Sequence, residues 1–222
     1  MTQTNPTQTP WRRIRSFVYR PGRLTSAQQN ALNVHLPHYQ FDPQAPWPTQ
    51  QAMVMEIGFG NGQALVEMAK AQPQAHIIGV EVHPPGVGRL LNALYAEDIN
   101  NVSVAMCDAV ALLEEHIPAH GLDEVRIYFP DPWPKKRHHK RRLIQPEFVR
   151  LLAERLKPLG RLHLATDWMP YAEWMEEVMS ASDVFKHQRE ATHNRPDTHF
   201  QRRGERKGHP IVDMIYQRAQ VS

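Results

Sequence analysis

The sequence contains a single cysteine, Cys107, among 222 residues. One cysteine excludes an internal disulfide and a cysteine-based metal cluster, and a reducing cytoplasm is the simplest location for such a chain. No apolar run approaches the roughly 18 residues of a membrane-spanning helix, and residues 1–10 lack the apolar core of a signal peptide. The histidines show no metal-binding spacing. We therefore expect a cytoplasmic protein without a membrane span or a bound metal.

The net charge of +3 conceals an uneven distribution along the chain. Residues 1–41 contain five arginines and no acid, residues 42–134 contain three basic and twelve acidic residues, and residues 135–222 contain eighteen basic and eleven acidic residues. An acidic middle between basic ends predicts that one part binds a cationic or hydroxyl-rich ligand and another binds a polyanion. Chance variation of surface charge is the alternative.

The most concentrated charge lies at residues 135–142, KKRHHKRR, which contain no acid. Such a run is typical of phosphate binding, because each cation that neutralises a phosphate releases condensed counterions. A nuclear-import signal is the competing interpretation, but this run lies mid-chain beside another motif rather than in a tail.

Short apolar runs alternate with amphipathic patterns over most of the chain. This alternation predicts parallel βαβ units and a doubly wound α/β sheet in a domain at 52–222. Before it we expect an N-terminal region, 1–51, made of a basic arm, a short helix capped by Thr25 and ending near Leu36, and a proline-containing linker or loop at 37–51. We expect strands at 53–57, 76–81, 102–106, 123–129, 161–166 and 211–217, and helices at 62–72, 85–97, 109–116, 146–156 and 168–181.

Acidic residues stand at or just after the ends of the expected strands. Because ligands of open parallel sheets bind at the carboxyl ends of the strands, these acids are candidates for one shared site. Any single one could instead be a helix cap or a turn residue. In chain order they are Glu56, Glu81, Asp108, Asp131 and Asp167.

A glycine-rich turn at Gly58, Gly60 and Gly62 follows the first expected strand. Its spacing differs from the G-x-G-x-x-G of dinucleotide enzymes, and Glu56 just before it would repel a pyrophosphate. An amine, a sulfonium, a ribose and an adenine amino group would suit the acids at the strand ends. S-adenosylmethionine carries all four, so the pattern favours this cofactor.

Four motifs in order resemble the bacterial tRNA (guanine-N7)-methyltransferase family, which methylates guanosine 46 in the variable loop of tRNA. The resemblance covers residues 15–218. The most specific motif is IYFPDPWPKKRH at 127–138; the others are residues 16–29, ATD at 165–167, and THFQ at 198–201 followed by Arg203-Gly204 and Gly208-His209.

The resemblance implies a mostly parallel Rossmann-like methyltransferase sheet with helices on both faces and a C-terminal antiparallel strand. It implies S-adenosylmethionine as cofactor, tRNA as partner, and neither a membrane nor an obligate protein partner; monomer and homodimer both stay open. Carried over by position, Asp131 is catalytic. The cofactor-binding residues are Glu56, Gly58, Gly60, Glu81, Asp108 and Asp131; the substrate-binding residues are Lys135, Asp167, Thr198, His199, Phe200 and Gln201; the RNA-contacting residues are Arg137, His138, His139, Lys140, Arg141 and Arg142.

Gln201 stands where the family usually has glutamate; it keeps an acceptor oxygen but loses the charge. The lone pair of guanine N7 is free at neutral pH, so we assign Asp131 to stabilising positive charge on the guanine rather than to a general base. Trp133 could stack on the base or pack in the turn. The rival hypotheses are a methyltransferase for a protein or small molecule, a non-catalytic RNA-binding module, and a nucleotide-linked dehydrogenase.

Overall fold

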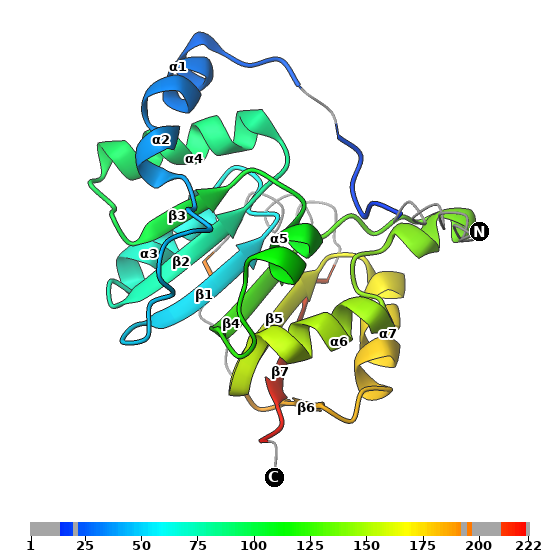
Figure 1. The fold of residues 1–222 in the computed structure, drawn as a ribbon. Coiled ribbons are helices and arrows are strands. Elements are labelled where there is room, and N and C mark those ends of the chain that lie inside the picture. The colour runs from blue at the N-terminus through cyan, green and yellow to red at the C-terminus, as the bar shows by residue number, and fades with distance from the viewer. Residues whose placement is uncertain (1–13, 20–21, 192–194, 197–209, 221–222) are drawn as a thin grey trace, which may run out of the picture.

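The computed structural model describes residues 14–19, 22–191, 195–196 and 210–220. Within them the chain forms a seven-stranded sheet in the order β3-β2-β1-β4-β5-β7-β6 (Figure 1). Strands β1 to β5 pair in parallel, whereas β7 runs antiparallel to both β5 and β6. The predicted α/β sheet with a C-terminal antiparallel strand is confirmed. The strands are β1 (Ala52–Ile57), β2 (Ala75–Val80), β3 (Val102–Ala105), β4 (Leu122–Tyr128), β5 (Leu156–Thr166), β6 (Phe185–His187) and β7 (Val212–Arg218).

Helices cover both faces of the sheet and form a separate hydrophobic core on each (Figure 1). One core lies under α3 (Gln63–Ala71) and α4 (Pro84–Ala96). The other lies under α5 (Ala109–Glu115), α6 (Pro146–Arg155) and α7 (Met169–Ser180). Burial on both faces explains why the central strands read as continuous apolar runs rather than as alternating patterns.

The N-terminal helix α1 (Ser26–Val34) begins at the predicted cap. The Thr25 hydroxyl accepts a hydrogen bond from the backbone N–H of Gln28, and the Gln28 side chain accepts one from the N–H of Thr25. Such a capping box satisfies two N–H groups that would otherwise lack partners. Gln28 also donates to the carbonyl oxygen of Pro85, which holds α1 against the start of α4.

The expected linker at 37–51 is wrong at its beginning. A one-turn helix, α2 (Leu36–Tyr39), follows α1 and buries Tyr39. The N–H of Phe41 then donates to the carbonyl oxygen of Val104 on β3. A single helical turn is too short to give a periodic pattern, so its packing could not be predicted from spacing.

Two short elements were also missed. Strand β6 is three residues long at the sheet edge, and residues Lys136–Arg141 of the basic run form a 3₁₀ helix, η1. In the part of the chain that the structure describes, no helix has the length and hydropathy needed to cross a membrane.

Candidate active site

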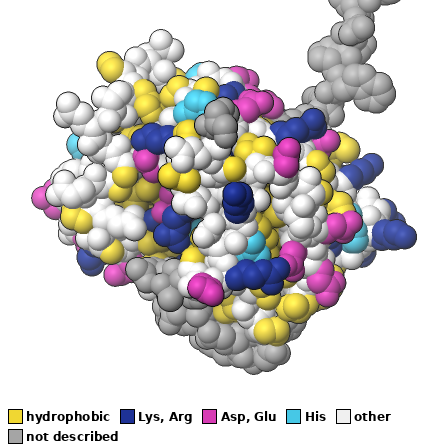
Figure 2. Space-filling model, turned by 90° about the horizontal axis from the view of Figure 1, so that it is seen from below, with side chains coloured by type: hydrophobic (Ala, Val, Ile, Leu, Met, Phe, Trp, Pro, Cys, Tyr) yellow, Lys and Arg dark blue, Asp and Glu magenta, His cyan; other side chains and the backbone are white. Residues whose placement is uncertain are grey.

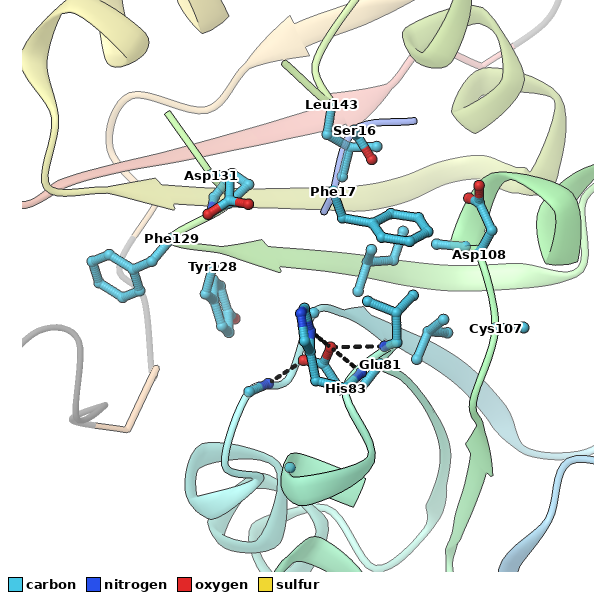
Figure 3. Close-up of a pocket in the computed structure, with 18 of the residues that line it drawn as sticks. Ser16, Phe17, Glu81, His83, Cys107, Asp108, Tyr128, Phe129, Asp131 and Leu143 are labelled. Carbon is cyan, nitrogen blue, oxygen red and sulfur yellow. Dashed lines mark hydrogen bonds and ion pairs between the residues drawn. The ribbon is translucent and has the colours of Figure 1, made fainter. Parts of the chain in front are cut away.

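A cavity of about 490 Å³ opens at the carboxyl ends of the central strands (Figure 3). Parallel strands present their carboxyl ends at one edge of the sheet, which is where the sequence predicted the ligand. The structure brings five of the six predicted cofactor residues to this cavity. They are Gly58, Gly60, Glu81, Asp108 and Asp131.

The glycine turn allows close approach of backbone to a ligand. Gly58 adopts a left-handed conformation, with φ of 77°, and a side chain built on it would meet nothing within 4 Å. The start of α4 packs closely against the turn, because a Cβ atom on Gly86 would collide with the carbonyl oxygen of Gly60. The turn is therefore fixed on one side and open toward the cavity on the other.

Glu81 braces the loops that form the cavity wall (Figure 3). Its Oε2 accepts a hydrogen bond from the N–H of Gly60 at 2.9 Å. Its Oε1 accepts from the N–H groups of Val82 and His83 and lies 2.9 Å from Nδ1 of His83. The carboxylate thus connects the glycine turn after β1 to the loop after β2 and still lines the cavity.

Asp108 is a helix cap, one of the two alternatives that the sequence left open, and it also lies at the cavity. Its carboxylate accepts from the N–H of Val110 at 3.0 Å and caps α5, and the residue also lines the cavity. The neighbouring Cys107 lines the same cavity, and burial raises the pKa of its thiol. A neutral thiol there is consistent with the expected role of a small apolar filler.

Glu56 lies apart from the other acids, because it does not line the cavity. Its side chain is 3% exposed, and its Oε2 has no hydrogen-bond partner among the described residues. Burial raises the pKa of Glu56 to about 7, although Arg126 on the adjacent strand opposes the shift. The structure therefore places Glu56 in the buried part of β1, outside the cavity lining.

Asp131 sits on a loop with unusual backbone geometry. Phe129 and Trp133 on either side of it adopt left-handed conformations, with φ of 52° and 46°. Each such residue without glycine's freedom costs roughly 1–2 kcal/mol. Conformations of this kind persist where surrounding contacts impose them.

One such set of contacts is a buried network that the sequence analysis missed. Arg195 donates two hydrogen bonds to the carboxylate of Asp213, at 3.0 and 2.9 Å, and its guanidinium lies 5.2 Å from the ring centre of Phe129. Asp213 also contacts Nε2 of His163 at 2.8 Å, and Nδ1 of His163 lies 3.0 Å from the hydroxyl of Tyr128. The network connects β4, β5 and β7, and through Phe129 it reaches the start of the loop that carries Asp131.

Residues Ser16 and Phe17 form part of the cavity wall (Figure 3). The indole N–H of Trp133 donates to the carbonyl oxygen of Ser16 at 2.9 Å. The guanidinium of Arg141 lies 5.1 Å from the ring centre of Trp133, and the His138 ring meets it edge-on at 5.8 Å. These contacts on several sides support the packing role for Trp133 that was one of two alternatives.

Comparison with known proteins shows the family of this chain. The family model described as "Putative methyltransferase" matches residues 50–214. A tRNA (guanine-N(7)-)-methyltransferase of Halorhodospira halophila is 48% identical, and the match covers 92% of this chain and 95% of that protein. The chain belongs to the tRNA (guanine-N7)-methyltransferase family.

Solved structures support the fold at much lower identity. An rRNA methylase of Streptococcus thermophilus has a TM-score of 0.52 at 16% identity, covering 92% of this chain and 99% of that one. A phosphoethanolamine N-methyltransferase of Haemonchus contortus, solved with S-adenosyl-L-methionine, has a TM-score of 0.50 at 13% identity, covering 87% of this chain and 53% of that one. The Rossmann-like methyltransferase fold is thus shared well beyond the family.

The basic run of this family member is an exposed turn beside the Asp131 loop. Lys136, Arg137 and Lys140 of η1 are exposed, as is Lys135 just before it, whereas His138, His139 and Arg141 are partly buried. On the face shown in Figure 2, acidic and basic side chains are intermixed among the described atoms. The run at 135–142 differs from that mixture in sequence, because it contains no acidic residue.

Arg142 corrects one prediction. It was expected to contact RNA, but it is 4% exposed and donates from Nε to the carbonyl oxygen of Pro132. A run of like charges gives no signal for which side chain is buried. The prediction treated all residues from 137 to 142 alike, and it therefore included Arg142.

Two other predicted substrate positions are described. Lys135 is exposed beside η1, and Asp167 is partly buried after β5 and outside the cavity lining. The remaining predicted positions, Thr198, His199, Phe200 and Gln201, lie outside the described residues. Among the described residues, no group of three or more His, Cys, Asp or Glu could hold a metal ion.

Proposed function

We propose that this protein transfers a methyl group from S-adenosylmethionine to N7 of guanosine 46 in the variable loop of tRNA. The observation that carries the proposal is a cavity lined by acids at the strand ends, directly beside an exposed basic turn, in a chain of the tRNA (guanine-N7)-methyltransferase family. A small neutral substrate would not need the basic turn.

The described residues fit S-adenosylmethionine. The open space in front of Gly58 leaves room for backbone contact with the methionine part. Glu81 lines the cavity and its carboxylate can accept from the ribose hydroxyls, a role that acids after the second strand commonly have. Asp108 and Asp131 add further acceptors for the adenine and for the positive charge of the cofactor. A structural neighbour with a TM-score of 0.50 binds S-adenosyl-L-methionine, which supports the assignment.

When bound, S-adenosylmethionine supplies an electrophilic methyl group on a positively charged sulfur. The N7 lone pair of guanine lies in the ring plane and carries no proton, so the protein need not provide a general base. Its residues must align the guanine with the methyl group and stabilise the positive charge that the ring gains. We assign the second task to Asp131, and its position in the cavity lining, a few residues before η1, supports this assignment.

Guanine recognition is assigned to the remaining motif positions. Lys135 lies between the Asp131 loop and η1, and Asp167 follows the neighbouring strand β5. The motif Thr198, His199, Phe200 and Gln201 completes the set by its position in the family pattern. With glutamine at 201, the amide oxygen can still accept from the N1–H or the amino group of guanine.

The tRNA backbone is assigned to the basic turn. Arg137 and Lys140 are exposed and can neutralise phosphates, while His138, His139 and Arg141 are only partly accessible. Such contacts give affinity and register but read little sequence, so the choice of guanosine must come from the cavity.

Incubation with labelled S-adenosylmethionine and unmodified tRNA, followed by nucleoside analysis, tests the proposal. The expected product is 7-methylguanosine in a tRNA with G46 and none in a matched tRNA with A46. Label elsewhere in the tRNA would overturn the position, and a different methylated nucleoside would overturn the target atom. Cofactor binding without transfer to tRNA would favour a protein or small-molecule substrate.

A further inference from the structure

Arg142 occupies a buried position between three elements. It follows η1 directly, and its backbone N–H donates to the carbonyl oxygen of His139 at 3.0 Å. Its side chain donates from Nε to the carbonyl oxygen of Pro132 at 3.0 Å, next to Asp131. Its guanidinium lies 4.9 Å from the ring centre of Tyr171 on α7. Its guanidinium also lies 3.3 Å from Nε2 of His139 on η1. The side chain thus contacts the basic turn, the active-site loop and α7.

This guanidinium has no balancing charge among the described residues, where no carboxylate oxygen lies within 4.0 Å of it. Its surroundings are the carbonyl oxygens of Pro132 and Pro170, the imidazole of His139, and the rings of Tyr171 and Trp174. Burial lowers its pKa. Burying a charge without a counter-charge is unfavourable. A residue kept there despite that cost supplies something that an apolar side chain cannot.

What the guanidinium supplies is a rigid planar fork. Lysine carries the same charge but presents a single flexible ammonium, which cannot stack on Tyr171 while donating sideways to Pro132. The fork holds the Pro132 carbonyl at a fixed distance from η1. Because Pro132 is bonded to Asp131, the same contact fixes the Asp131 loop relative to the exposed cations of the turn.

We propose that Arg142 is a positioning residue that couples the RNA-facing turn to the Asp131 loop, and that it does not contact phosphate. The proposal rests on the proposed function, since it assumes that η1 meets tRNA. Phosphates bound by Lys136, Arg137 and Lys140 fix the position of η1, and Arg142 transmits that position to the catalytic carboxylate. Binding of tRNA to η1 and correct placement of Asp131 are then coupled.

The deciding variant is Arg142→Lys, with Arg142→Gln beside it. Two quantities are measured: the salt dependence of tRNA binding by fluorescence anisotropy, and the single-turnover methylation rate at saturating tRNA and cofactor. For Arg142→Lys we expect an unchanged salt slope and a rate lowered by roughly 10- to 100-fold, because small misplacements of reacting groups cost up to about 100-fold. Cofactor affinity by calorimetry should stay within about twofold of the wild type.

Two matched variants give the comparison. Lys140→Gln removes an exposed cation of the turn and should reduce the salt slope by about 0.7–0.9, the loss expected for one phosphate contact. Arg150→Gln removes an exposed cation of α6. Among the described residues, Arg150 forms an ion pair only with Glu147, at the surface. This variant should change neither the salt slope nor the methylation rate.

Several results would overturn the proposal. If Arg142→Gln, which removes the charge, lowers the salt slope as Lys140→Gln does, Arg142 is a phosphate ligand. If Arg142→Lys folds and methylates at the wild-type rate, Arg142 contributes only to stability. Loss of the melting transition in both Arg142→Lys and Arg142→Gln would lead to the same conclusion. Absence of 7-methylguanosine with the wild-type protein would instead remove the proposed function itself.

Discussion

The indole N–H of Trp133 donates a hydrogen bond to the carbonyl oxygen of Ser16, 117 positions earlier in the chain, at 2.9 Å. This contact brings the N-terminal segment onto the loop that carries Asp131. Nε2 of His83 makes a second contact, 3.3 Å from the carbonyl oxygen of Val18. Because Ser16 and Phe17 line the cavity, a region that composition assigns to a basic arm forms part of the candidate active site.

Trp133→Phe should weaken binding of S-adenosylmethionine. The substitution keeps an aromatic ring but removes the donor that holds Ser16, and one hydrogen bond contributes about 0.5–1.5 kcal/mol, or roughly 2- to 10-fold in the dissociation constant. Calorimetric titration with the cofactor measures it. Trp47→Phe is the matched control, because its indole donates to the carbonyl oxygen of Gly121 away from this cavity. Equal affinities in all three proteins would mean that the segment is not part of the binding wall.

Asp131→Asn should lower the single-turnover methylation rate by roughly 100- to 1,000-fold, the usual effect of removing one group that stabilises developing charge. The amide keeps the shape of the side chain, so the loss would come from the charge. Rapid-quench assays at saturating tRNA and cofactor measure the rate. Asp98→Asn provides the control, because Asp98 is an exposed loop residue outside the cavity lining. A rate within threefold of the wild type would remove Asp131 from the catalytic role.

Asp213→Asn should destabilise the fold by about 3–5 kcal/mol, because it removes a carboxylate that pairs with the buried guanidinium of Arg195. Hydrogen bonds from His163 and Arg195 hold the pKa of Asp213 well below its usual range against the effect of burial. A carboxylate with a lowered folded-state pKa stabilises above its unfolded pKa, and loses that effect as the pH falls toward the folded value.

Urea unfolding of wild type and Asp213→Asn over a pH series measures both features. The difference in unfolding free energy should stay constant between about pH 8 and 5 and narrow only in stronger acid. Glu176→Gln, which removes an exposed ion pair with Arg189, should cost less than about 1 kcal/mol at every pH. A difference for Asp213→Asn that closes above pH 5 would show that this carboxylate is not the titrating group.

Glu56→Gln should flatten the dependence of stability on pH. Burial raises the pKa of Glu56 from 4.5 to about 7, so the folded state binds a proton that the unfolded state has released. The unfolding free energy of the wild type therefore falls as the pH rises from about 4.5 to 7, by on the order of 3 kcal/mol. Urea unfolding at pH 5 and 8 should show this fall in the wild type and a smaller one in the variant. An equal fall in unfolding free energy between pH 5 and 8 in the two proteins would contradict the raised pKa of Glu56.

Helix capping shows how far local sequence reaches. Thr25, a residue type that caps helices, predicted the start of α1, and the structure adds Gln28, three residues later, to the cap. The same holds for the glycine turn after β1, where one short segment contains both the chain reversal and the open backbone. Features of this kind are set by neighbours in the chain, so a sequence displays them directly.

Burial of particular members of a motif could not be predicted in this way. Arg141 and Arg142 are adjacent and chemically identical, yet one lies over Trp133 and the other is enclosed by α7. Glu56 and Glu81 both come at strand ends, yet Glu56 is buried away from the cavity and Glu81 lines it. Which of two similar residues turns inward depends on elements far away in the sequence.

The sequence by itself determined the alternating α/β sheet, the edge of that sheet where the cavity lies, and the family, because periodicity, strand-end acids and motifs are local properties. The tertiary structure alone decided that Ser16 closes the cavity wall, that Arg195 and Asp213 support the Asp131 loop, and that Arg142 faces inward. Each of these depends on contacts between segments separated by many residues in the chain, and such contacts exist only once the sheet and its helices have packed.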